Sequence, residues 1–410
     1  MANDFKNTSL VTRYAVKEFL NSLVLASKID RQLDDKNVFA GNIGSSVQVR
    51  RPVLFAATDG AAISSTPDLE EGTVTVTLDQ RKKVNFAVTS QDLTLNIEDA
   101  NERYIKPAMQ ELAQKVESAI ADSYSAIYNF VGTPGTTPST FLEVGAAGSL
   151  MSKLGVPMAG RCAFYDPDAS LNLANGLKSV FPQPIAKKAI EEASIGRYAG
   201  FDVYENQSLK MHTVGAHGGT PLINGASQDT TYLLSKDTDS QSLITDGWTN
   251  SITGILKAGD VFTIAGVNSV NRRTREDTGS LAQFVVLADA DSGASTGPAT
   301  LSISPPMITS GAFQTVTAAP ADGAAIVVKT GTASTAYRQN IAFHKNAITL
   351  ATAQIDTPTE GAVSSRENFD GISIRTVRQY NATSDETIYR FDILFGVKVQ
   401  NAGFACRTTG

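Results

Sequence analysis

The residues best able to do chemistry are few in this sequence. Only three histidines occur among its 410 residues: His212, His217 and His344. His212 and His217 lie in one glycine-rich stretch, but a metal site needs at least a third ligand and a rigid frame around it. Because the spacing of two ligands is weak support for a site, we interpret this pair as two solvated loop histidines.

The two cysteines, Cys162 and Cys406, lie far apart and form no Cys-x-x-Cys pair. This pattern supports neither a thioredoxin-type motif nor a cysteine-based zinc site. Two thiols in so long a chain also provide no disulfide framework, which fits a protein made in a reducing compartment.

Other catalytic signatures are equally sparse. The sequence contains no Gly-x-x-x-x-Gly-Lys-Ser/Thr loop for a nucleotide phosphate and no His-Glu-x-x-His zinc motif. We also expect no Gly-x-Ser-x-Gly nucleophile elbow. The tripeptide Lys329-Thr330-Gly331 matches one fragment of the penicillin-binding signature, but its companion motifs are missing. We therefore interpret it as a strand end followed by a turn.

Two acidic pairs, Asp289 with Asp291 and Glu70 with Glu71, could serve as acid and base or bind a hard cation. Their surroundings are turn-like, which favours solvated loop acids. The sequence therefore predicts no catalytic residue, no metal site and no cofactor.

Charge gathers in three basic clusters: Arg50 with Arg51; Arg81 with Lys82 and Lys83; and Arg272 with Arg273 and Arg275. The first two lie on opposite arms of a predicted hairpin. They are either a solvated strand edge that resists aggregation or a surface that docks on an acidic patch of a neighbouring subunit. Nucleic-acid contact is less favoured, because aromatic residues are not interleaved with the charges.

The amino-acid composition limits the classes of protein to which this chain can belong. Apolar residues make up 42% and charged residues 19%, with a formal net charge of −6. A disordered chain would be less hydrophobic and more highly charged, and a protein that mainly grips nucleic acid is usually basic. The length predicts roughly two or three domains.

Hydrophobic periodicity predicts the elements of the N-terminal half. Residues 9–26 and 99–131 carry apolar stripes of helical period, and Pro107 requires the second helix to begin or kink nearby. Between them, residues 46–55 and 73–88 read as the arms of a long hairpin, with the second arm interrupted by the charged stretch from Asp79 to Lys83. Such a ribbon is marginal alone, so a neighbouring subunit is its natural support.

The character of the chain changes after a mixed segment that ends near residue 210. Residues 213–338 show short strands separated by turn residues, which predicts a small antiparallel barrel or sandwich. The flanking segments read as one interrupted α+β domain. Residues 346–353 are predicted as a short helix, and 372–377 and 387–399 as two closing strands.

This order of elements resembles that of the major capsid proteins of tailed bacteriophages, which share the Hong Kong 97 fold. Four segments carry the resemblance. Three of them are similar to stretches that recur in the family: Ala342–Ala347, Ile372–Arg375 with Tyr380, and Tyr389–Val397. The fourth, Lys257–Val267, is similar to the insertion domain of short-tailed Salmonella phage coat proteins.

The resemblance implies an α+β capsid fold with an inserted antiparallel β-barrel. It implies six regions: an N-arm at 1–44, an extended-loop hairpin at 45–90, a peripheral domain with a spine helix at 91–140, a first axial part at 141–212, the inserted domain at 213–338, and the completion of the axial and peripheral domains at 339–410.

The same resemblance implies a function in shell assembly. Pentamers and hexamers of the chain would tile an icosahedral head around double-stranded DNA, with a scaffolding protein and a portal as partners. No signal peptide or membrane span is expected, so assembly in the bacterial cytoplasm and residence in the virion follow. The alternatives are a tail-tube or decoration subunit, a hydrolase that uses the loop acids, and a secreted adhesin.

Overall fold

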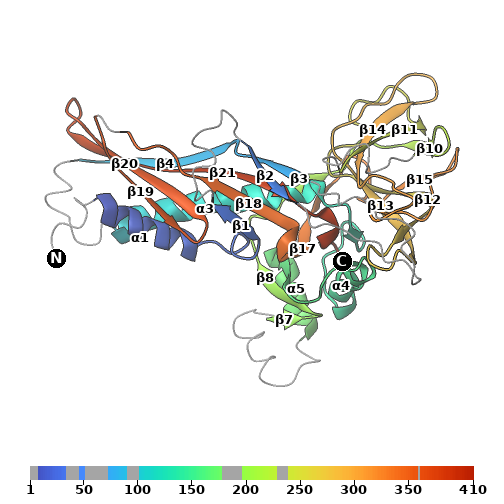
Figure 1. The fold of residues 1–410 in the computed structure, drawn as a ribbon, viewed down its shortest axis with the longest axis horizontal. Helices are drawn as coiled ribbons and strands as arrows, with labels where there is room; N and C mark the ends of the chain where they lie inside the picture. Colours follow the sequence, from blue (N-terminus) through green and yellow to red (C-terminus); the bar gives the residue numbers. More distant parts are fainter. Residues whose placement is uncertain are drawn as a thin grey trace, which may run out of the picture. The chain divides into compact units, whose positions relative to one another are not determined.

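The computed structural model describes residues 8–33, 46–50, 73–89, 101–177, 196–228, 239–358 and 361–410 (Figure 1). The chain divides into two compact units. Unit 1 comprises Met1–Gln48, Thr75–Ala121 and Ile348–Lys398, and unit 2 comprises Val49–Val74, Asp122–Ala347 and Val399–Gly410.

Unit 1 combines helices with a mixed sheet. Its helical segments are α1 (Thr8–Asn21), the π-helical turn η2 (Asn101–Ile105) and α3 (Lys106–Ala121). Its sheet has the order β1-β18-β21-β20-β19, with β4 paired to β21. The strands are β1 (Asp30–Leu33), β4 (Gln80–Thr89), β18 (Ile348–Ala353), β19 (Val363–Phe369), β20 (Ile372–Asn381) and β21 (Glu386–Val399).

The predicted helical stripes are confirmed as buried faces. Val11, Ala15 and Phe19 of α1 are buried, and so are Met109 and Leu112 of α3. The predicted 99–131 helix is wrong at its end, because a 3-10 turn (η3, Asp122–Ala126) leads into the strand β5 (Phe130–Val131). Aromatic and β-branched side chains favour that strand.

Pro107 stands in the first turn of α3, where its missing N–H costs no intrahelical hydrogen bond. Further along the same helix, Glu117 is buried. Its carboxylate accepts hydrogen bonds from the backbone N–H groups of Val24, Leu25 and Ala26, at 3.2, 2.9 and 2.9 Å. One acidic side chain thus fixes the chain that follows α1 onto α3.

The predicted hairpin is confirmed only in part. Strands β2 (Ser46–Arg50) and β3 (Thr73–Thr77) form a two-stranded sheet, and residues 51–72 lie outside the described residues. The return arm is interrupted at Leu78 and Asp79, between β3 and β4, and not over the whole predicted stretch from Asp79 to Lys83. β4 begins at Gln80 and pairs with β21 along its full length, because cross-strand bonding outweighs the low strand propensity of lysine.

Gly396 of β21 permits a close approach of the backbone of β3. A Cβ atom at this position would lie 2.0 Å from the carbonyl oxygen of Thr77. We expect Gly396→Ala to lower the free energy of unfolding by about 2 kcal/mol or more, because overpacked sites relax poorly. Urea denaturation of the unassembled subunit measures this. Gly361→Ala is the comparison, since its surroundings are open and only its positive φ should matter.

Unit 2 contains a second sheet, with the order β5-β22-β17-β6-β8-β7. Its remaining strands are β6 (Arg161–Tyr165), β7 (Arg197–Tyr198), β8 (Phe201–Glu205), β17 (Asn340–His344) and β22 (Ala405–Thr408). Helices α4 (Phe141–Lys153) and α5 (Pro167–Leu177) share a buried apolar cluster with it. Strand β9 (Met211–Thr213) pairs separately with β16 (Ala336–Arg338).

The short helix predicted at 346–353 is wrong. A 3-10 turn (η5, Lys345–Ala347) is followed by β18, whose six residues are all buried. The β-branched residues Ile348, Thr349 and Thr352 favour a strand once tertiary pairing is available.

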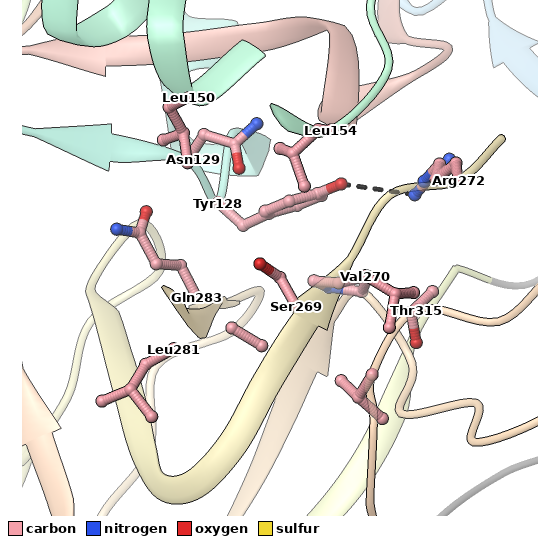
Figure 2. Close-up of a pocket in the computed structure, with 13 residues that line it drawn as sticks. Tyr128, Asn129, Leu150, Leu154, Ser269, Val270, Arg272, Leu281, Gln283 and Thr315 are labelled. Atoms are coloured by element: carbon pink, nitrogen blue, oxygen red, sulfur yellow. Dashed lines mark hydrogen bonds between the residues drawn. The ribbon is translucent and has the colours of Figure 1, made fainter. Parts of the chain in front are cut away.

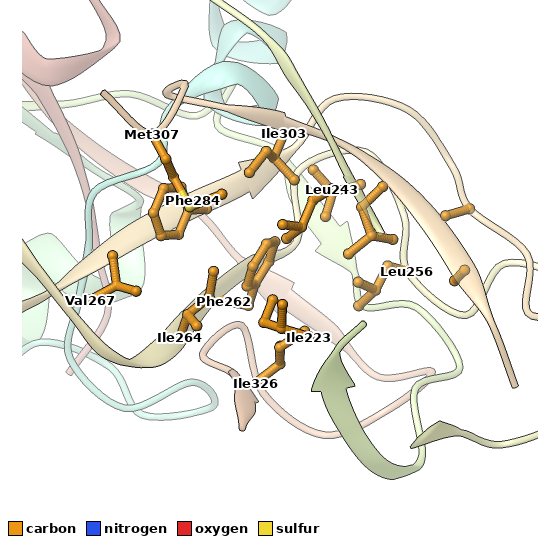
Figure 3. Packing of buried hydrophobic residues seen from close by; sticks show 14 of the residues in the cluster. Ile223, Leu243, Leu256, Phe262, Ile264, Val267, Phe284, Ile303, Met307 and Ile326 are labelled. Atoms are coloured by element: carbon orange, nitrogen blue, oxygen red, sulfur yellow. The ribbon is translucent and has the colours of Figure 1, made fainter. Parts of the chain in front are cut away.

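The β-rich character predicted for 213–338 is confirmed. Six antiparallel strands follow the order β10-β11-β14-β13-β12-β15, and a bridge between Leu222 and Ala325 nearly closes them into a barrel. The strands are β10 (Gly219–Ile223), β11 (Gln241–Trp248), β12 (Val261–Val270), β13 (Asp277–Val286), β14 (Ala299–Ser304) and β15 (Ile326–Val328). Figure 3 shows Phe262 and Phe284 among the aliphatic side chains that fill its interior.

Candidate functional site

A buried carboxylate lies at the base of the barrel. Asp260 immediately precedes β12 and is fully buried. Its Oδ1 accepts hydrogen bonds from Nε2 of His212 (2.8 Å) and Oγ1 of Thr330 (2.9 Å). Its Oδ2 accepts from the backbone N–H groups of Gly215 (2.9 Å) and Lys257 (2.8 Å). Burial alone would raise the pKa of Asp260, but these hydrogen bonds, with that of His212 foremost, hold it below its usual value.

His212 is buried, so the interpretation of both histidines as solvated is wrong for this residue. Its second ring nitrogen, Nδ1, lies 3.3 Å from the hydroxyl of Tyr124. His217 is half-buried, and its Nε2 lies 3.0 Å from the carbonyl oxygen of Gly331. The spacing of the two histidines gave no signal of this difference, because the partners lie 48 and 114 residues further along the chain.

A buried arginine extends this polar centre toward the C-terminal strand. Arg407 of β22 is fully buried. Its guanidinium lies over the rings of Tyr124 (5.9 Å) and Phe130 (5.7 Å), and its Nη1 donates to Oε1 of Gln339 at 3.4 Å. Burial lowers the pKa of Arg407 to about 10. The aromatic faces replace part of the lost hydration through cation–π attraction.

The Asp260–His212 pair has the geometry of a general-base dyad, but its surroundings favour a structural role. A catalytic histidine needs a free ring nitrogen within reach of a nucleophile, whereas Nδ1 of His212 faces the hydroxyl of Tyr124. Both oxygens of Asp260 are occupied by two donors each. Within the described ranges, no group of three or more His, Cys, Asp or Glu side chains is placed to hold a metal ion.

The expectation that the sequence lacks a Gly-x-Ser-x-Gly pattern is wrong. Gly293-Ala294-Ser295-Thr296-Gly297 fits the Gly-x-Ser-x-Gly pattern of a nucleophile elbow, which requires a strand-to-helix turn. Here it lies between β13 and β14 of the barrel, with residues 294–296 exposed and Gly297 buried. Gly297 is needed because a Cβ atom would lie 1.9 Å from the carbonyl oxygen of Trp248. These residues therefore form a turn between two strands and not a nucleophile elbow.

A small pocket lies where the hairpin between β12 and β13 meets α4 (Figure 2). Tyr128 and Arg272 are its titratable lining residues, and Nη2 of Arg272 donates to the Tyr128 hydroxyl at 3.3 Å. Leu150, Leu154 and Leu281 supply apolar walls. This lining carries no acid, base or nucleophile pair for catalysis.

The Arg272 cluster occupies the tip of that hairpin. Arg272 binds Tyr128, and the side chain of Arg273 passes beside Gly155 at the C-terminal end of α4, where a helix favours positive charge. Nε of Arg275 donates to the carbonyl of Gly311 at 3.1 Å. Arg273 is exposed, whereas Arg272 and Arg275 are half-buried.

The second basic cluster lies on β4. Nη2 of Arg81 donates to Oδ2 of Asp392 at 3.0 Å within the same subunit. Lys83 is exposed and Lys82 is half-buried, on alternate faces of the strand. Arg50 ends β2, while Arg51, Glu70 and Glu71 lie outside the described residues.

The loop acids of the barrel act as backbone acceptors. Oδ1 of Asp289 accepts from the N–H of Ala258 at 2.9 Å, and Oδ1 of Asp291 accepts from the N–H of Gly254 at 2.6 Å. Both contacts order turns, so these carboxylates have a structural use.

A family model and a relative each match this chain over nearly its whole length. A family model described as "P22 coat protein - gene protein 5" matches residues 1–405. A major capsid protein of Acyrthosiphon pisum secondary endosymbiont phage 1 is 24% identical over 416 residues, which cover 96% of each chain.

Solved structures give weaker likenesses. The chain aligns with a structure of Mycobacterium phage Che8 at a TM-score of 0.45 and 14% identity, covering 94% of this chain and 90% of that one. A capsid structure of cyanophage P-SCSP1u gives a TM-score of 0.42 and 11% identity, covering 89% and 83%. The CUS-3 coat protein I-domain is 28% identical at a TM-score of 0.20, covering 28% of this chain and 97% of that one. Among the described residues, no helix is long and apolar enough to cross a membrane.

Proposed function

Since this chain belongs to the P22 coat protein family and is a phage major capsid protein, we propose that it assembles through pentamers and hexamers into an icosahedral head that encloses double-stranded DNA. The family match over residues 1–405 carries the proposal. A closed shell is the outcome expected when identical subunits associate through symmetric and near-symmetric contacts.

The proposal includes the Hong Kong 97-like arrangement and its region boundaries. In that arrangement α3 is the spine helix of the peripheral domain, β2 and β3 belong to the extended loop, and the barrel within 213–338 is the inserted domain. The helix-backed sheet of unit 1 and the nearly closed barrel of unit 2 support this assignment.

The chain is proposed to act without catalysis. The acid–histidine pair most like a catalytic dyad is buried and fully bonded, which supports a structural use. A hydrolase using the loop acids is disfavoured because Asp289 and Asp291 bind backbone amides. A tail-tube or decoration subunit is disfavoured by the family match over the whole chain.

The proposed partners are further copies of the chain, a scaffolding protein, a portal, and packaged DNA bound without sequence preference. Assembly would take place in the cytoplasm of the host bacterium. Arg272, Arg273 and Arg275 stay candidates for contacts of the barrel, with the exposed Arg273 the best placed of the three.

Expression of the chain in bacteria, alone and with candidate scaffolding proteins, tests the function. Negative-stain electron microscopy with sedimentation is expected to show closed shells, or spirals and open sheets where the scaffold is missing. A subunit that stays monomeric with every scaffold supplied would contradict shell building. It would favour the decoration-subunit alternative.

A further inference from the structure

Two Asn-Gly dipeptides occur in the sequence, Asn175-Gly176 and Asn224-Gly225. Asparagine is thermally labile, because the backbone nitrogen of the next residue can attack its side-chain amide and expel ammonia. Glycine as that next residue favours the attack, since it has no side chain to hinder it and gives the backbone wide freedom to rotate. The structure places the two dipeptides in opposite surroundings, one inside a helix and the other where a strand of the barrel ends.

The first dipeptide is held rigidly. Asn175 lies within α5, and helical dihedral angles keep its side-chain carbon out of line for attack by the next backbone nitrogen. Gly176 is also packed closely, because a Cβ atom there would lie 2.2 Å from the carbonyl oxygen of Ser139. Closing a ring at Asn175 would require the end of α5 to unwind, so we expect this residue to stay intact while the subunit is folded.

The second dipeptide is accessible. Asn224 directly follows Ile223, the last residue of β10, whose side chain lies in the barrel interior (Figure 3). The side chain of Asn224 is exposed, and it makes no hydrogen bond to another residue that the structure describes. Gly225 has a φ of +101°, a conformation that glycine adopts without strain. The amide of Asn224 is therefore free to turn toward the nitrogen of Gly225.

Two side chains act on the peptide bond between Asn224 and Gly225. Oδ1 of Asp322 accepts a hydrogen bond from the Gly225 N–H at 2.8 Å. A carboxylate at this distance is placed to take the proton as a general base. Nε2 of Gln228 donates to the carbonyl oxygen of Asn224 at 2.8 Å, which draws electron density from the peptide bond and makes its N–H more acidic.

We propose that Asn224 is a site of spontaneous deamidation in the folded subunit, with Asp322 as the general base. The nitrogen of Gly225 gives its proton to Asp322 and forms a bond to Cγ of Asn224. The bond from Cγ to the amide nitrogen breaks, and that nitrogen leaves as ammonia with the proton that Asp322 had taken. Water then opens the five-membered imide at either carbonyl, which leaves aspartate or isoaspartate at position 224. The reaction belongs to the folded subunit and does not depend on shell building.

The product would lie at the seam that nearly closes the barrel. Next to position 224, the N–H of Gly323 donates to the carbonyl oxygen of Ile223 at 2.9 Å. A new carboxylate beside Asp322 would place two like charges at this seam, which disfavours the contact. Isoaspartate would also add a methylene group to the backbone and shift the register of the bonds on either side. Ageing of the subunit should therefore loosen the barrel.

Peptide mass spectrometry of the purified subunit tests the site. The tryptic peptide 211–236 contains Asn224 as its only asparagine, and fragmentation of the peptide 162–178 reports Asn175. The urea-unfolded chain is the reference, because both dipeptides are equally accessible there. We expect folding to slow the reaction of Asn175 at least about tenfold, since it then waits for local opening of α5, and to leave Asn224 at least as reactive as in the unfolded chain. Equal protection of both residues by folding would overturn the proposal.

Substitution of the base tests its role. Asp322→Ser removes the carboxylate and should slow the reaction of Asn224 in the folded subunit about tenfold, at the lower end of what general-base catalysis contributes. Asp322→Glu keeps a carboxylate and should restore most of the rate. Glu276→Gln removes another exposed carboxylate of the barrel and is the matched control, with no change expected. An unchanged rate in folded Asp322→Ser would overturn the assignment of Asp322. If that variant does not fold, a wild-type rate no higher in the folded than in the unfolded chain would overturn it instead.

Ageing tests the consequence for the barrel. The single tryptophan, Trp248, lies in the barrel core, so its fluorescence follows unfolding of the barrel in urea. We expect the midpoint to fall as Asn224 is converted, and Asn224→Asp to show a lowered midpoint without ageing. Asn224→Gln should keep its midpoint over the same period, because its longer side chain would have to close a less favourable six-membered ring. An aged wild-type subunit that is converted at position 224 but unfolds at the original midpoint would overturn the effect on the seam.

Discussion

Asp260→Asn is expected to lower the free energy of unfolding of the subunit by about 3–5 kcal/mol, because one buried carboxylate accepts from four donors. An amide offers one acceptor oxygen, so its NH₂ group would face donors that lose their partner. The loss should be concentrated in the barrel, where Asp260 joins the start of β12 to Thr330 and Gly215.

The single tryptophan makes this loss measurable in the barrel itself. Trp248 is buried in the barrel core, and its indole N–H donates to Oγ1 of Thr245 at 2.9 Å. Urea unfolding followed by Trp248 fluorescence should shift to lower urea in Asp260→Asn. Glu276→Gln removes an exposed carboxylate from the same barrel and should change the midpoint little. Equal midpoints for the two variants would refute the central role of Asp260.

The spacing of apolar residues along the sequence correctly predicted those helices and strands that bury one regular face. The stripes of α1 and α3 and the strict alternation of β21 each match the buried face in the structure. These signals succeed because a helix or strand that buries one face must repeat its apolar residues at the period of its own backbone.

The failures share a different cause. Residues 348–353 and Arg81–Lys83 form strands because they pair with segments more than 300 residues away in the sequence. β18 pairs with β1, and β4 pairs with β21. The spacing of residues along the chain carries no trace of such partners. Only tertiary pairing selects the strand, so propensity alone misassigns it.

The polar centre of unit 2 was missed for the same reason. Asp260, His212 and Arg407 come from three distant parts of the chain, and Thr330 lay in a tripeptide that was set aside as a turn. The sequence signal closest to it was the short segment Lys257–Val267, whose resemblance to a family insertion domain includes Asp260. The contacts among these side chains could not be predicted from the sequence, because only the fold brings them together.

Asp392 gives the second large effect, in unit 1. Its side chain is fully buried, with hydrogen bonds from Arg81 (3.0 Å), Arg390 (2.7 Å) and Arg375. Burial alone would raise the pKa of Asp392, but the three guanidinium groups, led by Arg390, hold it below its usual value. The single negative charge of Asp392 therefore connects arginine side chains from three strands, β4, β20 and β21.

We expect Asp392→Asn to lower the free energy of unfolding by about 3 kcal/mol at pH 7, because three arginines would lose their counter-charge. Because the pKa of Asp392 is lower in the folded state than in the unfolded state, its carboxylate stabilises the folded protein. This stabilisation is fully present above the unfolded-state pKa of about 3.9, and it is lost as the pH falls through the folded-state pKa. The gap between wild type and variant should thus be widest near neutral pH and shrink below about pH 4. Far-UV circular dichroism during urea unfolding at several pH values measures it. Glu111→Gln, which removes an exposed partner of Lys115, should cost little, and a gap independent of pH would show that Asp392 acts through packing rather than charge.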